Sequence, residues 1–352
     1  MTSSLQILTN IDRRGLVRSF GSEEEALKRG NVKGTATIYP NHTISFEIYP
    51  TGTINEWSTI LRFNTNEENC VKHGDRSPLL HFHANTLNLC IKYGKDGAGE
   101  FNYGIEKVPT ALTKFQWSKI DLVVQNQGAK DESVIVVFIN GQFAVEQSLG
   151  FRSWVKPEGT VHEVWTSDNF CPPASAVIRN LAVYTPLMGR TIAFYNDVAQ
   201  SFLFAFEDDT GKNFAKVNQW RTKSVTPANI SQFAFDAIKF KVVDAGGGYV
   251  ALWNLATKRF LRITDNGTVD CTVVSADAVY NNPGWVCEKF SITEAPVPKG
   301  LYTLYVPGPV DQSLFVEPGT YNTRGSKGQY KPWWQHELFS VVLTSKADSR
   351  IA

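Results

Sequence analysis

Short segments in which apolar and polar residues alternate recur along almost the whole chain. Examples are TISFEIYP at 43–50, KIDLVV at 119–124 and VIVVFING at 134–141. They are rich in β-branched and aromatic residues and are separated by Gly, Asn, Asp and Pro, which predicts strands joined by turns. Helical periodicity is scarce, and SEEEALKRG at 22–30 is the best short candidate for a helix. The pattern therefore predicts an all-β protein of the sandwich or barrel kind.

The C-terminal part also carries an internal repeat. The segment KFSIT at 289–293 contains Phe290, and similar strand-like segments contain Phe240 and Phe339. These three phenylalanines stand 50 and 49 residues apart. No comparable self-similarity is found before about residue 190, so the sequence predicts a domain boundary between residues 190 and 200.

Three similar units of about fifty residues have one favoured closed arrangement. Around a pseudo-threefold axis they close a barrel and leave no exposed sheet edge. Residues 199–352 are therefore predicted to form a β-trefoil of three repeats, with the three repeated phenylalanines in its core. Within the second strand of each repeat, Phe214, Phe260 and Leu314 are expected to be equivalent.

One copy of the repeat carries a family resemblance. YVALWNLATKRFLRITDNGTVDC at 249–271, followed by WVCEKFSI at 285–292, resembles the fascin-like, actin-crosslinking group of β-trefoils. The resemblance implies a cytoskeletal or other protein-interaction module, with actin as one partner to consider. The basic binding surface of that family has no residue-by-residue match here. The Gln-x-Trp signature of ricin-type lectins is also absent, and VNQW at 217–220 is its nearest approach.

The N-terminal half resembles the laminin-G-like or concanavalin-like jelly-roll group. The order of its strand-like segments carries the resemblance, including an Asn-Gly pair that predicts a type I′ hairpin turn. It implies an antiparallel β-sandwich for residues 1–190, and it implies no function because this sandwich serves sugar, peptide and structural roles. The segments are STILRF (58–63), GDRSPLLHFHANTLNLCI (74–91), FQWSKIDLVV (115–124), VIVVFINGQFAVE (134–146) and WTSDNFCPPASAVIRNLAVY (165–184).

Composition limits the partners. Hydrophobic residues make up 42% of the 352 residues and charged residues 20%, which is enough for a packed core. Lys and Arg total 35 against 34 acidic residues, so bulk charge gives no support for nucleic-acid binding. No apolar run approaches the roughly 20 residues of a membrane span, and no signal peptide is recognised at the N-terminus. The compartment stays open between the cytoplasm and export by a non-classical route.

The cysteines could form disulfides or remain reduced thiols. The five cysteines form no CxxC pair, so a structural zinc site is not expected. Cys70 with Cys90, and Cys271 with Cys287, are near enough in sequence to form disulfides in an oxidising compartment. The alternative is reduced, buried thiols.

Catalytic and metal motifs are scarce. His81 and His83 share one face of a predicted strand and His73 is nearby, but further metal ligands are not evident, so ordinary packing is expected instead. The sequence shows no nucleophile with its base, no phosphate-binding glycine loop and no strand with alternating acids. It therefore predicts neither a metal, nor a cofactor, nor an enzyme; a glycan-processing enzyme on the jelly roll is the less favoured alternative.

Aromatic residues beside polar residues are the best functional lead. An aromatic face stacks on a sugar ring while Asn, Gln and His side chains hydrogen-bond its hydroxyls. The alternative is that these tryptophans pack the base of the trefoil. The candidate ligand-binding residues are Trp220, Trp253, Asn254, Trp333, Trp334, Gln335 and His336.

The favoured function is non-enzymatic recognition of carbohydrate by a multivalent lectin. Threefold scaffolds offer up to three pockets, and several weak sites give avidity for glycans. The loops DDTGKN, NLATKR and PGPVDQ share little, so one or two working sites are expected. A fascin-like protein-interaction module is the alternative from a different class.

Overall fold

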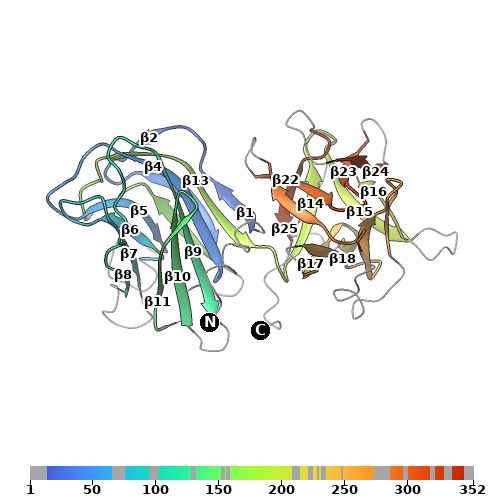
Figure 1. Ribbon diagram of the computed structural model, residues 1–352, viewed down its shortest axis with the longest axis horizontal. Helices are drawn as coiled ribbons and strands as arrows, with labels where there is room; N and C mark the ends of the chain where they lie inside the picture. Colours follow the sequence, from blue (N-terminus) through green and yellow to red (C-terminus); the bar gives the residue numbers. More distant parts are fainter. Residues whose placement is uncertain are drawn as a thin grey trace. The chain divides into compact units, whose positions relative to one another are not determined.

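The chain forms strands almost throughout. Apart from a 3-10 turn, η2 (Asp236–Ile238), every regular element described here is a β-strand (Figure 1), which confirms the all-β prediction. The expected helix at 22–30 is wrong, because this stretch holds the short strand β2 (Glu25–Ala26), which pairs with β13. No helix in the described part of the chain has the length and apolar character of a membrane span. The computed structural model describes residues 14–65, 76–94, 103–127, 132–151, 155, 159–207, 215–220, 225–227, 230, 235–246, 249–272, 286–295, 300–317, 322–328 and 335–344.

The chain divides into two compact units, residues 16–186 and residues 187–351, and the described residues 14 and 15 group with the second of them. The first unit contains two antiparallel sheets. The seven-stranded sheet has the order β1 (Arg14–Ser19), β13 (Ala176–Pro186), β4 (His42–Pro50), β9 (Ser118–Gln127), β10 (Glu132–Ile139) and β11 (Gln142–Ser148), with β2 on β13. The six-stranded sheet has the order β3 (Val32–Ile38), β12 (Thr160–Trp165), β5 (Ser58–Asn64), β6 (Leu79–Phe82), β7 (Leu89–Tyr93) and β8 (Tyr103–Ile105).

One hydrophobic core lies between these sheets. Phe46 of β4 and Leu122 of β9 belong to it from one sheet, and Phe63 of β5 and Leu80 of β6 from the other. Successive side chains of a strand point to opposite faces, so alternate residues of each strand supply the core. The first unit is therefore two sheets packed on a shared core, whereas the finer jelly-roll assignment stays a prediction.

The second unit is built from three repeats of four strands. The first is β14 (Thr191–Asn196), β15 (Ser201–Glu207), β16 (Ala215–Trp220) and β17 (Phe240–Asp244). The second is β18 (Val250–Asn254), β19 (Arg259–Ile263), β20 (Val269–Cys271) and β21 (Ser291–Glu294). The third is β22 (Leu301–Val306), β23 (Gln312–Val316), β24 (Thr323–Lys327) and β25 (Phe339–Leu343).

The first and fourth strands of the repeats close a ring. β14 pairs with β17, β17 with β18, β21 with β22, β22 with β25, and β25 with β14. A bridge between Val250 and Phe290 joins β18 to the segment that enters β21. The other strands form three hairpins, β15–β16, β19–β20 and β23–β24. A six-stranded ring with three hairpins is the β-trefoil arrangement that the repeat predicts.

The repeats begin earlier than expected. β14 pairs with β17 and β25, so the second unit includes residues before the predicted start at 199. The pairing of Tyr195 with Phe202 in the first repeat matches that of Trp253 with Phe260 in the second.

This register corrects the predicted equivalence in the second strands. Phe202 is the counterpart of Phe260, and Ser313, which pairs with Tyr305, takes the place expected for Leu314. Phe214 lies outside the described residues. The sequence prediction began the first repeat at β15, whereas the structure begins it one strand earlier, at β14.

The core of the second unit contains the repeated phenylalanines. Phe240, Phe290 and Phe339 each have an exposed fraction of 0%, as predicted. The ring centroid of Phe194 on β14 lies 5.9 Å from that of Phe240 and 6.2 Å from that of Phe339. The regular spacing of the three phenylalanines in the sequence therefore corresponds to buried positions in the core of the second unit.

Candidate functional site

The two described tryptophans among the predicted ligand residues pack against other rings. Trp253 is half-buried and meets Phe260 edge-on, with 4.8 Å between ring centroids. Trp220 is also half-buried, with its ring centroid 4.6 Å from that of Phe235. Tyr195, the counterpart of Trp253, makes the same kind of contact with Phe202 at 4.7 Å. This repetition favours the packing alternative for Trp253, and the ring contact with Phe235 favours it for Trp220.

Asn254 holds a turn together. Its exposed fraction is 0%, and its Nδ2 donates to the carbonyl oxygens of Ala237 at 2.8 Å and Lys239 at 3.3 Å. Its Oδ1 accepts from the backbone N–H of Ala256 and of Thr257 at 3.1 and 3.0 Å. A fully buried amide with this many partners offers no atom to a ligand, so the structure contradicts its assignment to a binding site.

Asn196 repeats the role of Asn254 in the first repeat. Its Nδ2 donates to the carbonyl oxygen of Leu338 at 2.9 Å, and its Oδ1 accepts from Ala199 N–H at 2.7 Å. Leu338 and Lys239 directly precede the core residues Phe339 and Phe240. Each asparagine therefore holds the backbone segment that directly precedes one core phenylalanine.

The Asn254→Ala variant is expected to lower the free energy of unfolding by about 1–3 kcal/mol, because it leaves buried backbone groups without partners. Urea unfolding of the full chain measures this loss. Asn196→Ala is the matched variant and should show a similar loss. A change below about 0.5 kcal/mol in both would contradict the turn-holding role.

The remaining predicted residues lie before β25. Gln335 is exposed, and the His336 ring centroid lies 5.8 Å from that of Phe315 on β23. The guanidinium carbon of Arg324 stands 5.0 Å from the centre of the Phe315 ring. Trp333 and Trp334 lie outside the described residues. The structure therefore brings His336 near the β23–β24 hairpin, and no ring contact or side-chain hydrogen bond joins it to the other described candidates.

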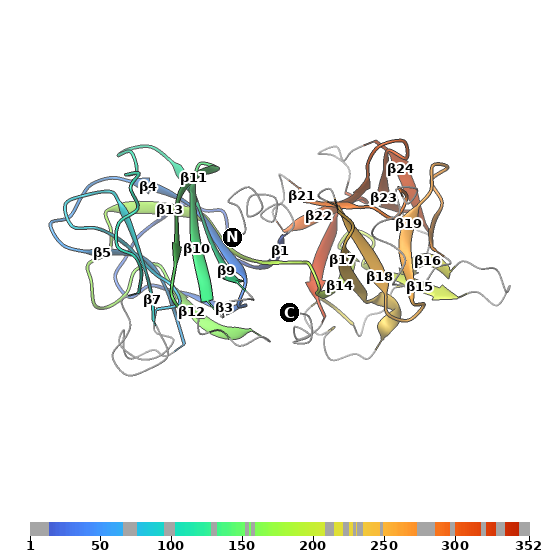
Figure 2. The ribbon, with the colours of Figure 1, turned by 60° about the horizontal axis from the view of Figure 1, so that its bottom comes forward.

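A polar cavity lies where the three hairpins meet. Figure 2 shows β16, β19, β23 and β24 gathered on one side of the second unit. The volume of this cavity, the cap cavity, is about 470 Å³. All three repeats contribute residues to its walls. They are Lys216, Val217, Asn218, Asn266, Gly267, Thr268, Val269, Glu317, Asn322, Thr323, Arg324 and Gly325.

Two glycines let the second and third repeats meet at this cavity. Gly325 N–H donates to the Gly267 carbonyl oxygen at 2.7 Å. A Cβ on Gly325 would stand 2.7 Å from Ile263 Cγ2 and 2.8 Å from Gln312 Oε1, closer than real contacts allow. Gly267 has a φ of +82°, a region that favours glycine. Side chains at these positions would force the hairpins apart.

The first and third repeats are joined by side-chain hydrogen bonds. Gln219 is buried, and its Nε2 donates to the carbonyl oxygens of Glu317 at 3.1 Å and Asn322 at 2.6 Å. The Thr323 hydroxyl donates to the Val217 carbonyl oxygen at 2.6 Å. These contacts make the cap cavity a preformed feature of the fold.

The walls of the cap cavity carry polar side chains. The side-chain amide of Asn218 makes no hydrogen bond to any other described residue. Asn266 Oδ1 accepts from Thr268 N–H at 3.0 Å, which fixes the side chain of this turn residue. Arg324 Nε lies 3.2 Å from Glu317 Oε1, so this cation is oriented but still 61% exposed. The cavity therefore presents amide and guanidinium donors together with amide and carboxylate acceptors.

The histidines of the first unit are packed against an aromatic ring. The ring centroids of His81 and His83 lie 6.1 and 4.7 Å from that of Trp57. Burial lowers the pKa of His81 from 6.5 to about 4. Within the described ranges, no three His, Cys, Asp or Glu side chains are grouped for a metal, and His73 lies outside these ranges.

The described cysteines are free thiols. Cys90, Cys271 and Cys287 are unbridged, so neither disulfide considered from the sequence is formed. Burial raises the pKa of Cys271 and of Cys90 to about 12, which keeps both protonated at neutral pH. Cys70 lies outside the described residues.

Comparisons with known proteins give distant similarities. No family model matches the chain, and no curated protein matches it. The GlcNAcα1-4Gal-releasing endo-β-galactosidase from Clostridium perfringens is 12% identical with a TM-score of 0.36, over 89% of this chain and 74% of that one. SeviL bound to the asialo-GM1 saccharide is 14% identical with a TM-score of 0.31, over 44% and 98%. The BEL β-trefoil is 11% identical with a TM-score of 0.34, over 44% and 94%. These similarities are too weak to assign a function.

Proposed function

We propose that this chain is a carbohydrate-binding protein and that the cap cavity of its second unit holds the glycan. The observation that carries the proposal is the composition of the walls: Asn218, Asn266 and Asn322 from the three repeats, beside the ion pair of Arg324 and Glu317. Sugar hydroxyls both donate and accept hydrogen bonds. Amide side chains supply both kinds of partner, and an oriented guanidinium adds a charge-assisted donor.

The predicted aromatic stacking does not contribute to this site. No Trp, Tyr or Phe is among the described residues that line the cap cavity, so hydrogen bonds would supply most of the affinity. Binding of this kind is weak at a single site and gains strength when several sites engage one surface. This agrees with a lectin that acts on arrays of glycans.

We propose recognition without catalysis. Glu317 is the one carboxylate among the described residues of the cap cavity, and Arg324 pairs with it. Hydrolysis of a glycosidic bond commonly uses two facing carboxyl groups, one of them an acid that gives up its proton. For the first unit we propose membership of the laminin-G-like or concanavalin-like jelly-roll group, supported by its two antiparallel sheets on one core.

The Arg324→Ala and Asn218→Ala variants are expected to lower glycan affinity about tenfold each, since each removes hydrogen bonds to the ligand. Biosensor titrations of the full chain against immobilised neutral and acidic glycans measure the affinities. Lys239→Ala is the matched control, because it removes a cation paired with Asp236 that lies outside the cap cavity. Equal affinities for the wild type and both cavity variants would disprove the assignment of the site.

A further inference from the structure

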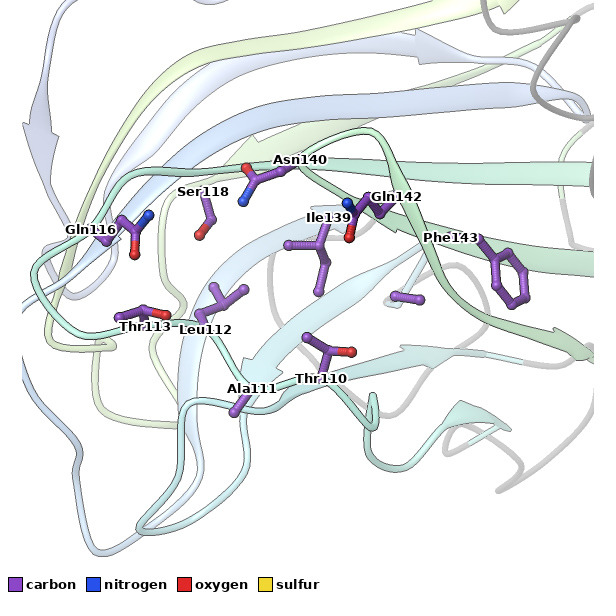
Figure 3. A pocket seen from close by; sticks show the side chains of 11 residues that line it. Thr110, Ala111, Leu112, Thr113, Gln116, Ser118, Ile139, Asn140, Gln142 and Phe143 are labelled. Carbon is purple, nitrogen blue, oxygen red and sulfur yellow. The ribbon is translucent and has the colours of Figure 1, made fainter.

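The first unit has a cavity of its own. Figure 3 shows it between the loop that precedes β9 and the turn that joins β10 to β11. Its volume is about 280 Å³, and we name it the sandwich cavity. Leu112 and Ile139, with exposed fractions of 5% and 9%, bring apolar side chains to it.

Both walls of the sandwich cavity are held by backbone hydrogen bonds. Leu112 N–H donates to the Leu87 carbonyl oxygen at 3.0 Å, and Phe115 N–H donates to that of Pro50 at 2.8 Å. On the other wall, Asn140 and Gly141 have φ angles of +53° and +77°, as expected for the predicted type I′ turn. Asn140 Oδ1 accepts from Lys119 N–H at 2.8 Å, which ties this turn to β9. The cavity is therefore preformed.

The polar groups in the sandwich cavity are neutral and unused. Gln116 and Gln142 project from opposite walls in Figure 3. Neither side-chain amide makes a hydrogen bond to any residue in the described ranges. Thr113 adds a hydroxyl, and none of the described lining residues is Asp, Glu, Lys, Arg or His. The cavity therefore offers amides and hydroxyls without a charge to attract an ion.

One exposed phenyl ring accompanies these amides in the sandwich cavity. Phe143 lines the sandwich cavity and is 48% exposed. Phe115, the residue before Gln116, does not line the cavity, and Lys114 Nζ lies 4.7 Å from its ring centroid. Its φ of +62° is rare for a bulky side chain. Unusual backbone conformations of this kind are found preferentially at functional sites. An exposed ring beside side-chain amides is the combination that binds the apolar face and the hydroxyls of one sugar.

We infer that the sandwich cavity binds a neutral sugar ring, so that the chain carries a second carbohydrate site on a separate unit. The inference shares its ligand class with the proposed function but uses other residues. The absence of lining charges favours neutral sugars over sialic or uronic acids. Two sites on one chain would make it bivalent towards a glycan surface.

Methyl NMR of the full chain tests this inference. Signals of Leu112 and Ile139 report on the sandwich cavity, whereas those of Val217 and Val269 report on the cap cavity. The probes are lactose, maltose, cellobiose and N,N′-diacetylchitobiose, with glucuronate as the acidic comparison. We expect saturable shifts of Leu112 and Ile139 with at least one disaccharide and none with glucuronate.

Glutamine variants provide the second arm of the test. Gln116→Ala and Gln142→Ala should each weaken the response at Ile139 about fivefold or more. Gln147→Ala is the matched control, because its side chain lies on the same strand, is bonded to the Gly104 carbonyl oxygen and does not line the cavity. It should leave the response unchanged.

The outcomes separate this inference from the proposed function. No saturable shift at Leu112 and Ile139 with any of the four disaccharides overturns the inference, as does an unchanged response in both cavity variants. Shifts confined to Val217 and Val269 would overturn it while supporting the proposed function. Shifts confined to Leu112 and Ile139 would support it and count against the cap cavity.

Discussion

Replacing Phe194 by alanine is expected to lower the free energy of unfolding of the second unit by about 3–5 kcal/mol. Phe194 has an exposed fraction of 0% and contacts Phe240 of its own repeat and Phe339 of the third repeat. Removing its ring deletes buried apolar contacts and leaves a cavity that the closed barrel cannot easily collapse. Urea unfolding, followed at the methyl signal of the buried Ile192 on β14, measures the loss.

The control for this prediction is Val198→Ala. Val198 belongs to the same unit but is 49% exposed, so its truncation should change the free energy of unfolding by less than about 0.5 kcal/mol. If Phe194→Ala cost as little as Val198→Ala, the phenylalanine layer would not be the core that the repeat spacing reports.

Acid is expected to destabilise the first unit strongly between pH 6.5 and pH 4. Burial lowers the pKa of His42, His81 and His162 from 6.5 to about 4. In this pH window the unfolded chain takes up a proton at each histidine while the folded state does not, so stability falls as the pH falls. Each histidine contributes up to about 3 kcal/mol of this loss.

The acid prediction is tested by urea unfolding at pH 7 and pH 4.5, followed at the methyl signal of Ile44, which is buried in the first unit. His42→Gln removes one titrating group and should make the pH dependence shallower. An identical pH dependence in the wild type and in His42→Gln would contradict the prediction for this residue.

One group in the second unit is expected to change stability with pH in the opposite direction. Burial raises the pKa of Glu337 from 4.5 to about 7. The folded state holds this proton up to about pH 7, so the contribution to stability is present below pH 4.5 and lost as the pH rises through 7. Between pH 4.5 and 6.5 these groups therefore shift the stabilities of the two units in opposite directions.

The architecture was largely predictable because it rests on periodic signals. Alternation of apolar residues identified the strands, and the spacing of Phe240, Phe290 and Phe339 identified three repeats. The start of the first repeat was missed because β14 resembles any other buried strand in sequence. Its pairings with β15, with β17 and, almost 150 residues later, with β25 assign it to the second unit.

The site was much less predictable. An asparagine beside a tryptophan at a strand end suits a sugar ligand, but it equally suits a turn whose backbone needs a buried partner, and Asn254 is the second case. The cap cavity draws on residues far apart in sequence, such as Asn218, Asn266 and Arg324, so no local motif reveals it. The single hint was VNQW at 217–220, where Asn218 and not Trp220 reaches the cavity.

The central claim is that this chain recognises carbohydrate, and a glycan array probed with the labelled full chain tests it most directly. We expect saturable binding to a defined subset of glycans, lost or reduced in the Arg324→Ala variant. A chain that is folded, as judged by its NMR spectrum, yet binds no glycan on the array would contradict the claim. That result would favour the fascin-like alternative, for which cosedimentation with actin is the next measurement.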